Sequence, residues 1–260
     1  VTLGPIIMTI ALTQMNSWRV GYRVVGGFQL ALAFCFILTL KMWTQKDEHR
    51  GSAEPKRLTD YKTPVLETLR QPQVWLSTAL FFLYVGAETS LGTWTYSLLT
   101  EARGINPTVA GFFAGSYWAT FTVGRVVAGP FAKRAGVNLL VLAGSAGAIL
   151  GAGLLIWNPS EQANVLAVAL IGISIAPIFP AMMSGTSQRV GEHFAANTIG
   201  MQMAATGFGA AVIPSLMGIL ARQVSLEVIP IFLLAVYAVL AGVYLLSARS
   251  RKPERTPISV

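Results

Sequence analysis

Long apolar runs, each about the length of a membrane-spanning helix, alternate along this chain with short polar stretches. A helix needs about 20 predominantly apolar residues to cross the hydrocarbon core of a bilayer. After a shorter run at 1–14, which is typical of the end of a helix, full spans are predicted at 20–43, 74–99, 107–131, 137–157, 163–187, 196–221 and 226–247. The pattern predicts an all-α polytopic membrane protein.

One connection between these runs is far longer than the others. Residues 44–73 form a polar linker of about 30 residues, and its last part, 63–69, has the pattern of a short amphipathic helix at the bilayer surface. The other joints are short turns. We therefore predict four parts: the end of an N-terminal bundle (1–43), a linker (44–73), a C-terminal six-helix bundle (74–247) and a tail (248–260).

Composition and charge support a membrane protein and orient it. Of the 260 residues, 53% are apolar and 12% are charged, whereas soluble domains average about 25% charged. Fifteen of the 19 Lys and Arg residues fall on the side that holds the linker and the tail. Cytoplasmic loops carry such an excess, so we expect the linker and the C-terminus in the cytoplasm. Anionic lipid headgroups account for the net charge of +8, and no nucleic-acid partner is expected.

Several classes of site are not expected. Cys35 is the single cysteine, and His49 and His193 are far apart, so neither a disulfide framework nor a metal site is predicted. A phosphate-binding loop, an HExxH motif and a GxSxG motif are all lacking, which disfavours a membrane enzyme or a bound cofactor. The chain begins with Val1 and a short apolar run without a basic leader, so we expect it to begin partway through a longer protein.

One acidic residue, Glu88, lies inside a predicted span. An intramembrane carboxylate costs about 2.5–3.5 kcal/mol on insertion scales and usually faces a cavity or a partner. Tyr84, Gly92 and Thr95 share its helical face. We interpret Glu88 as a hydrogen-bond acceptor for substrate or as a proton carrier. The alternative is a structural carboxylate bonded to a neighbouring helix.

Aromatic residues gather on this span and the next: Tyr84, Trp94, Tyr117 and Trp118. Aromatic faces stack on the apolar side of sugars and their polar tips bind hydroxyls, although core packing suits any one of them. Arg125, near the cytoplasmic end of its span, is expected to snorkel or pair at the interface.

Two later spans carry further signals. Pro177 and Pro180 remove backbone donors, so their helix should kink or partly unwind, either as a gate or as a static kink. In the following span, Asn197 and Gln202 belong to a polar stripe that we expect to face a cavity or another helix. We predict a substrate path lined by Glu88, Tyr84, Trp94, Tyr117, Trp118, Asn197 and Gln202.

Six spans after a long basic linker resemble the second half of a major facilitator superfamily transporter. By this resemblance, 1–14 and 20–43 are part of helix five and all of helix six, and the later spans are helices seven to twelve. Gly4-Pro5 resembles the Gly-Pro of helix five, and 129–136 (GPFAKRAG) resembles the GxxxDRxG loop, with Lys133 in place of the Asp. The fold implied is the C-terminal six-helix bundle of a major facilitator plus helix six and part of helix five.

A closer resemblance is to the fucose–proton symporter family. Residues 84–89 (YVGAET) are similar to its helix-seven YVGAQT segment, with Glu88 in place of Gln, and 110–114, Tyr117 and 124–125 are similar to its helix eight. The resemblance implies alternating access between two halves, with proton-coupling carboxylates in the first half, and a bacterial inner membrane.

We expect a secondary active transporter of a small polar solute, a sugar or related metabolite, driven by a proton gradient. Its expected partners are the solute, membrane lipid and the N-terminal half. The alternatives are a drug or metabolite efflux antiporter and a non-transporting receptor or scaffold.

Overall fold

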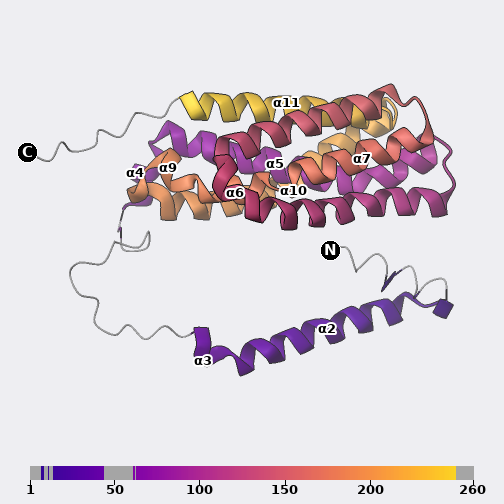
Figure 1. Cartoon of the computed structure of the whole chain (residues 1–260), viewed down its shortest axis with the longest axis horizontal. Helices are drawn as coiled ribbons and strands as arrows, with labels where there is room; N and C mark the ends of the chain where they lie inside the picture. Colours follow the sequence, from indigo (N-terminus) through magenta and orange to yellow (C-terminus); the bar gives the residue numbers. More distant parts are fainter. Residues whose placement is uncertain (1–6, 9–10, 12–13, 44–60, 62, 250–260) are drawn as a thin grey trace, which may run out of the picture. The chain divides into compact units, whose positions relative to one another are not determined.

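The computed structural model describes residues 7–8, 11, 14–43, 61 and 63–249, and within them it is helical and contains no strand (Figure 1). The predicted all-α class is thereby confirmed. The chain divides into two compact units, residues 1–56 and 57–260. The division falls inside the predicted linker, much of which lies outside the described residues, so the four-part domain boundaries stay a prediction.

The described helices of the first unit are α2 (Trp18–Leu38) and α3 (Leu40–Trp43). They correspond to the single span predicted at 20–43. Thr39 separates them, and its hydroxyl donates to the carbonyl of Cys35 (2.8 Å), a contact of the kind that bends helices. The helix end predicted at 1–14, with its Gly4-Pro5 pair, lies largely outside the described residues.

The second unit is a helical bundle. Its described part begins with the short helix α4 (Val65–Leu69), where the sequence predicts an amphipathic helix. The later elements are α5 (Pro72–Ser97), the π-helical turn η2 (Leu98–Ala102), α6 (Pro107–Trp157), α7 (Glu161–Ile175), α8 (Ile178–Ser184), α9 (Thr186–Val190), α10 (Glu192–Gln223) and α11 (Val228–Arg249). Figure 1 shows the long helices of this unit lying lengthwise beside one another.

Among the described residues, six helical stretches are long and apolar enough to cross a membrane: Trp18–Leu38, Pro72–Ala102, Arg134–Trp157, Glu161–Ser184, Glu192–Gln223 and Val228–Arg249. The remaining predicted span, 107–131, is helical but less apolar, because Arg125 and several hydroxyl side chains interrupt it. The protein is thus an integral membrane protein by the length and composition of its helices.

α6 contains two of the predicted spans. The helix kinks at Gly136 (φ 72°, ψ 159°), a backbone conformation that suits glycine because it has no Cβ. The loop that the resemblance places at 129–136 is therefore helical up to this one residue. The side chain of Lys133 lies outside the described residues.

The predicted break in the proline-containing span is confirmed. α7 ends at Ile175 and α8 begins at Ile178, with Ala176 and Pro177 in a turn between them. Pro177 has no N–H to donate to the preceding turn, and its ring crowds that turn, so the helical ladder stops here.

The helices α5 and α10 approach each other closely through small residues. A Cβ on Gly209 of α10 would collide with the backbone of Phe82 on α5, and one on Gly86 of α5 would collide with the side chain of Ile213. Small residues at such crossings let two membrane helices come into backbone contact. The contact joins the first and fifth spans of the bundle, which are distant in sequence.

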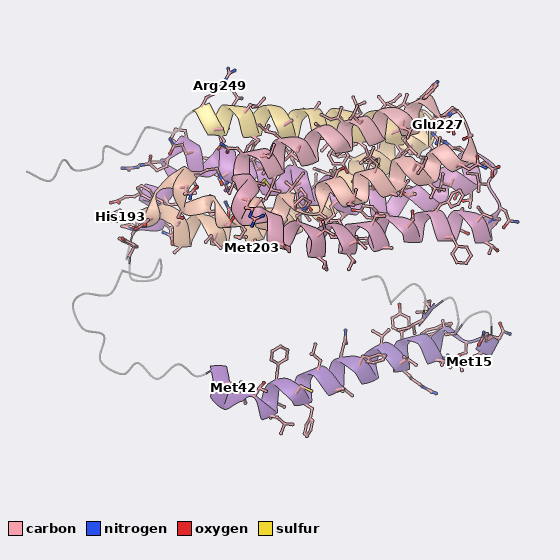
Figure 2. The ribbon with its side chains drawn as sticks, viewed as in Figure 1. Met15, Met42, His193, Met203, Glu227 and Arg249 are labelled. Carbon is pink, nitrogen blue, oxygen red and sulfur yellow. The ribbon has the colours of Figure 1, made fainter. Side chains whose placement is uncertain are left out.

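At one end of the bundle, Arg103 joins four segments. Its guanidinium donates to both carboxylate oxygens of Glu227 (2.8 and 2.7 Å), to the carbonyl of Leu155 (2.8 Å) and to the side chain of Asn164. Figure 2 shows Glu227 at the end of the bundle opposite to His193. η2, the end of α6, the start of α7 and the α10–α11 connection are thereby held together.

Replacing Gly209 by Ala should destabilise the bundle, because the added methyl group meets the backbone of Phe82, which cannot move aside alone. We expect the free energy of unfolding to fall by about 1–3 kcal/mol, as for other overpacked sites. Gly207→Ala is the control, since a Cβ there meets open space. Denaturant unfolding in detergent compares the two variants, and an equal effect of both would contradict the close crossing.

Candidate functional site

Five side chains from three helices lie near enough to one another to interact electrostatically: Tyr84 and Glu88 of α5, Tyr117 and Arg125 of α6, and Tyr237 of α11. We call these residues the Glu88 cluster. It contains one carboxylate, one guanidinium and three phenols. Each of these groups offers hydrogen-bonding atoms, and all five belong to helices that the sequence places in the membrane.

Tyr84 connects the cluster to the break between α7 and α8. Its side chain is fully buried, and its hydroxyl donates to the carbonyl of Ile175 (3.0 Å), the last residue of α7. The same hydroxyl interacts with the side chains of Glu88 and Arg125. Tyr84 therefore fixes the carboxylate-bearing face of α5 against the broken helix.

Tyr117 supports Glu88 from the neighbouring helix. Its hydroxyl donates to the backbone carbonyl of Glu88 (3.0 Å). Trp118 packs beside Tyr117, with ring centroids 4.7 Å apart, and fills the space in front of Gly92. Glu88 is only half-buried, so its carboxylate lies at the edge of this aromatic surface.

Arg125 is exposed on α6 and stacks over an aromatic ring of its own helix. Its guanidinium carbon lies 4.4 Å from the centre of the Phe121 ring, and it interacts electrostatically with Glu88. The sequence predicts that Arg125 snorkels or pairs at the interface. That expectation stays a prediction.

Trp94 lies away from the Glu88 cluster. Its indole N–H donates to the carbonyl of Pro214 (3.0 Å), and its ring covers Gly218, so it ties α5 to α10. A contact with substrate stays a prediction for this residue.

The two predicted amides hold structural hydrogen bonds. The amide nitrogen of Gln202 donates to Ser77 (2.7 Å) and Thr186 (3.2 Å) in the buried junction of α5, α9 and α10. The amide of Asn197 donates to Thr63 (2.9 Å) and Thr68 (3.1 Å) and so anchors the region of α4 on α10. The expectation that the stripe faces another helix therefore holds for both amides, and their contact with substrate stays a prediction.

A buried arginine belongs to the same junction. Arg189 of α9 donates to the carbonyl of Met182 and to the hydroxyls of Thr186 (3.3 Å) and Ser77 (3.4 Å). The side chain is only 3% exposed. Gln202 and Arg189 thus share acceptors, which explains why amide and hydroxyl groups gather here.

Pro177 and Pro180 lie beside the cluster rather than in it. Pro177 ends the turn that follows Ile175, and Pro180 is exposed on α8. Between them, Phe179 contacts the rings of Phe81 and Tyr84, with centroids 5.2 and 6.0 Å apart. A gating role for the two prolines stays a prediction.

Tyr237 is the member of the cluster that sequence reasoning missed. Its hydroxyl is fully buried, has no hydrogen-bond partner among the described residues and interacts electrostatically with Glu88. One feature of the sequence could have identified it: a phenol in the middle of α11, which is the most apolar of the candidate spans. In the described part of the chain, no three His, Cys, Asp or Glu side chains gather where they could hold a metal ion.

The chain matches the family model described as Major Facilitator Superfamily over residues 1–212 and 99–259. It is 30% identical over 195 residues to Bypass of stop codon protein 6 of Saccharomyces cerevisiae, covering 71% of this chain and 39% of that protein. It is 25% identical over 201 residues to Sodium-dependent glucose transporter 1 of Homo sapiens, covering 76% of this chain and 37% of that protein. It is 28% identical over 204 residues to Sodium-dependent glucose transporter 1A of Mus musculus, covering 76% of this chain and 45% of that protein. The chain thus spans less than half the length of these curated relatives.

Replacing Gln202 by Met should lower stability, because Ser77 and Thr186 lose a buried hydrogen-bond partner while the volume is kept. We expect a loss of about 1–3 kcal/mol in the free energy of unfolding, the usual cost of an unsatisfied buried group. Gln223→Met, at the exposed end of the same helix, is the matched control. Equal stability of the two variants in detergent would contradict the structural role of Gln202.

Proposed function

The chain belongs to the Major Facilitator Superfamily, and on this basis we propose that it forms part of a secondary active transporter for a small polar solute. The observation that carries the proposal is the Glu88 cluster. Charged groups inside a membrane bundle are costly and usually mark a substrate or ion pathway. Here the helix that carries Glu88 is positioned by two hydrogen bonds, from Tyr84 to the carbonyl of Ile175 and from Tyr117 to the backbone carbonyl of Glu88.

An uncharged sugar is the class of solute that suits this cluster best. Glu88 offers an acceptor for hydroxyl groups, Arg125 offers donors, and Trp118 offers an aromatic face beside them. Aromatic rings with polar neighbours suit sugars, which have an apolar C–H face and a polar rim. Two relatives are named as glucose transporters, which supports the same class.

The whole transporter would operate by alternating access and would draw on an ion gradient. We propose a proton as the coupling ion, as the resemblance to the fucose–proton symporters implies, and the names of two relatives make sodium the alternative. Because the chain spans only 37–45% of its relatives, we propose that further helices preceding it complete the first half. The linker and the tail would face the cytoplasm, as the distribution of Lys and Arg indicates.

The full-length protein reconstituted in liposomes should accumulate at least one uncharged sugar above its outside concentration when a pH or sodium gradient is imposed. The accumulation should vanish when an ionophore collapses the gradient, since the gradient supplies the free energy. Uptake of a panel of radiolabelled sugars measures this, with protein-free liposomes as the control.

Two other results would replace the proposal. Drug-driven proton release without sugar accumulation would identify an efflux antiporter. Sugar binding without transport under either gradient would identify a receptor. The efflux antiporter is the weaker candidate on physical grounds, because apolar drugs gain little from a carboxylate beside a guanidinium.

A further inference from the structure

The break between α7 and α8 is enclosed by other segments of the bundle. Ile175, Ala176 and Ile178, which flank it, are fully buried. On one side lies α5, where the hydroxyl of Tyr84 donates to the carbonyl of Ile175 (3.0 Å). A hydrogen bond to the backbone thus ties α5 to the end of α7.

The part of α6 before Gly136 meets the break from a second side. A Cβ on Gly124 would lie 2.8 Å from the Cβ of Ala176 and 2.8 Å from the carbonyl oxygen of Ile173. Real Cβ atoms do not come so close to their neighbours. The two backbones are therefore in direct contact, as small residues allow between membrane helices.

The part of α6 after Gly136 meets the same helix from a third side. A Cβ on Gly144 would lie 2.5 Å from the carbonyl oxygen of Ser174, and one on Gly147 would collide with the side chain of the same serine. Both parts of α6 are thus packed at backbone distance against the residues just before the break.

This packing opposes bending at the break. A hinge absorbs large changes in φ and ψ at a few residues, and the segments on either side swing. Here a swing would press the carbonyls of Ile173 and Ser174 into α6 or open a void beside it, and a close-packed interior resists both. It would also remove the donor from the carbonyl of Ile175, in a place where hydrocarbon offers no substitute.

We propose that the Ala176-Pro177 break is a fixed joint and not a gate. α5 and the two parts of α6 hold it, so the helices of the second unit move as one body when the transporter alternates. This inference rests on the proposed transport function. It decides between the two interpretations of the prolines that the sequence leaves open, because the kink is static and its shape is set by packing.

Distances between spin labels measure bending at the break in the full-length protein, in liposomes and without native cysteines. One pair joins Leu166 of α7 to Ser184 of α8, two exposed positions on either side of the break. We expect this distance to change by less than about 2 Å when glucose and sodium are added, since packed elements shift only slightly. A reference pair joins Leu166 to Phe34 of α2, which belongs to the other unit, and should change by more than this.

Three variants test what sets the kink. Gly144→Ala should lower the apparent melting temperature in detergent by at least about 2 °C, because the added methyl group meets the carbonyl of Ser174. Gly153→Ala, on the same part of α6, is the control, since a Cβ there meets open space. Pro177→Ala should keep most of the wild-type sugar uptake, because the contacts that hold the break remain.

Three results would overturn the inference. In the first, the Leu166–Ser184 distance changes together with the reference pair, which would make the break a gate. In the second, Pro177→Ala is as stable as the wild type yet loses uptake. In the third, Gly144→Ala and Gly153→Ala melt at the same temperature, which would remove the packing that holds the joint. A reference pair that stays fixed contradicts alternating access, and with it the proposed function, instead.

Discussion

The arrangement of the candidate site depends on the hydrogen bond between the hydroxyl of Tyr84 and the carbonyl of Ile175. Inside a membrane, backbone groups must find partners within the protein, because the hydrocarbon offers none. The Ala176-Pro177 turn interrupts the regular ladder of that helix, and Tyr84 supplies a side-chain donor at the point of interruption. The break is thereby stabilised, and the helix that carries Glu88 is placed beside it.

Charge balance explains the remaining polar groups of the bundle. Arg103 is compensated by Glu227 at one end. Arg189 is held by hydroxyls and a carbonyl in the junction that also contains Gln202. The guanidinium groups of Arg103 and Arg189 are thus met by oxygen atoms from other segments of the chain. The same contacts that lower the cost of the charge also join the helices.

Sequence periodicity predicted the helices well, because membrane spans are long, apolar and bounded by turn residues. The break at Pro177 followed from the chemistry of proline, and the break at Thr39 was not foreseen because threonine is common within helices.

The candidate site was predicted less completely. Glu88, Tyr84 and Tyr117 come together as their positions on adjacent spans suggested. The involvement of Tyr237 depends on how α11 packs against α5 and α6, and the structural bonds of Asn197 and Gln202 depend on α4 and α9. Neither arrangement is encoded in the spacing of residues on a single helix.

The two ends of the bundle are built from helices of different lengths. At the end near Glu227, one guanidinium cross-braces four segments, so these segments resist sliding past one another. Beyond the Ala176-Pro177 turn, toward His193, the corresponding helix is divided into the short pieces α8 and α9, which resist bending less than one continuous rod. Arg189 braces that end as well, but it joins short pieces instead of long helices, so bending would concentrate at the joints between them.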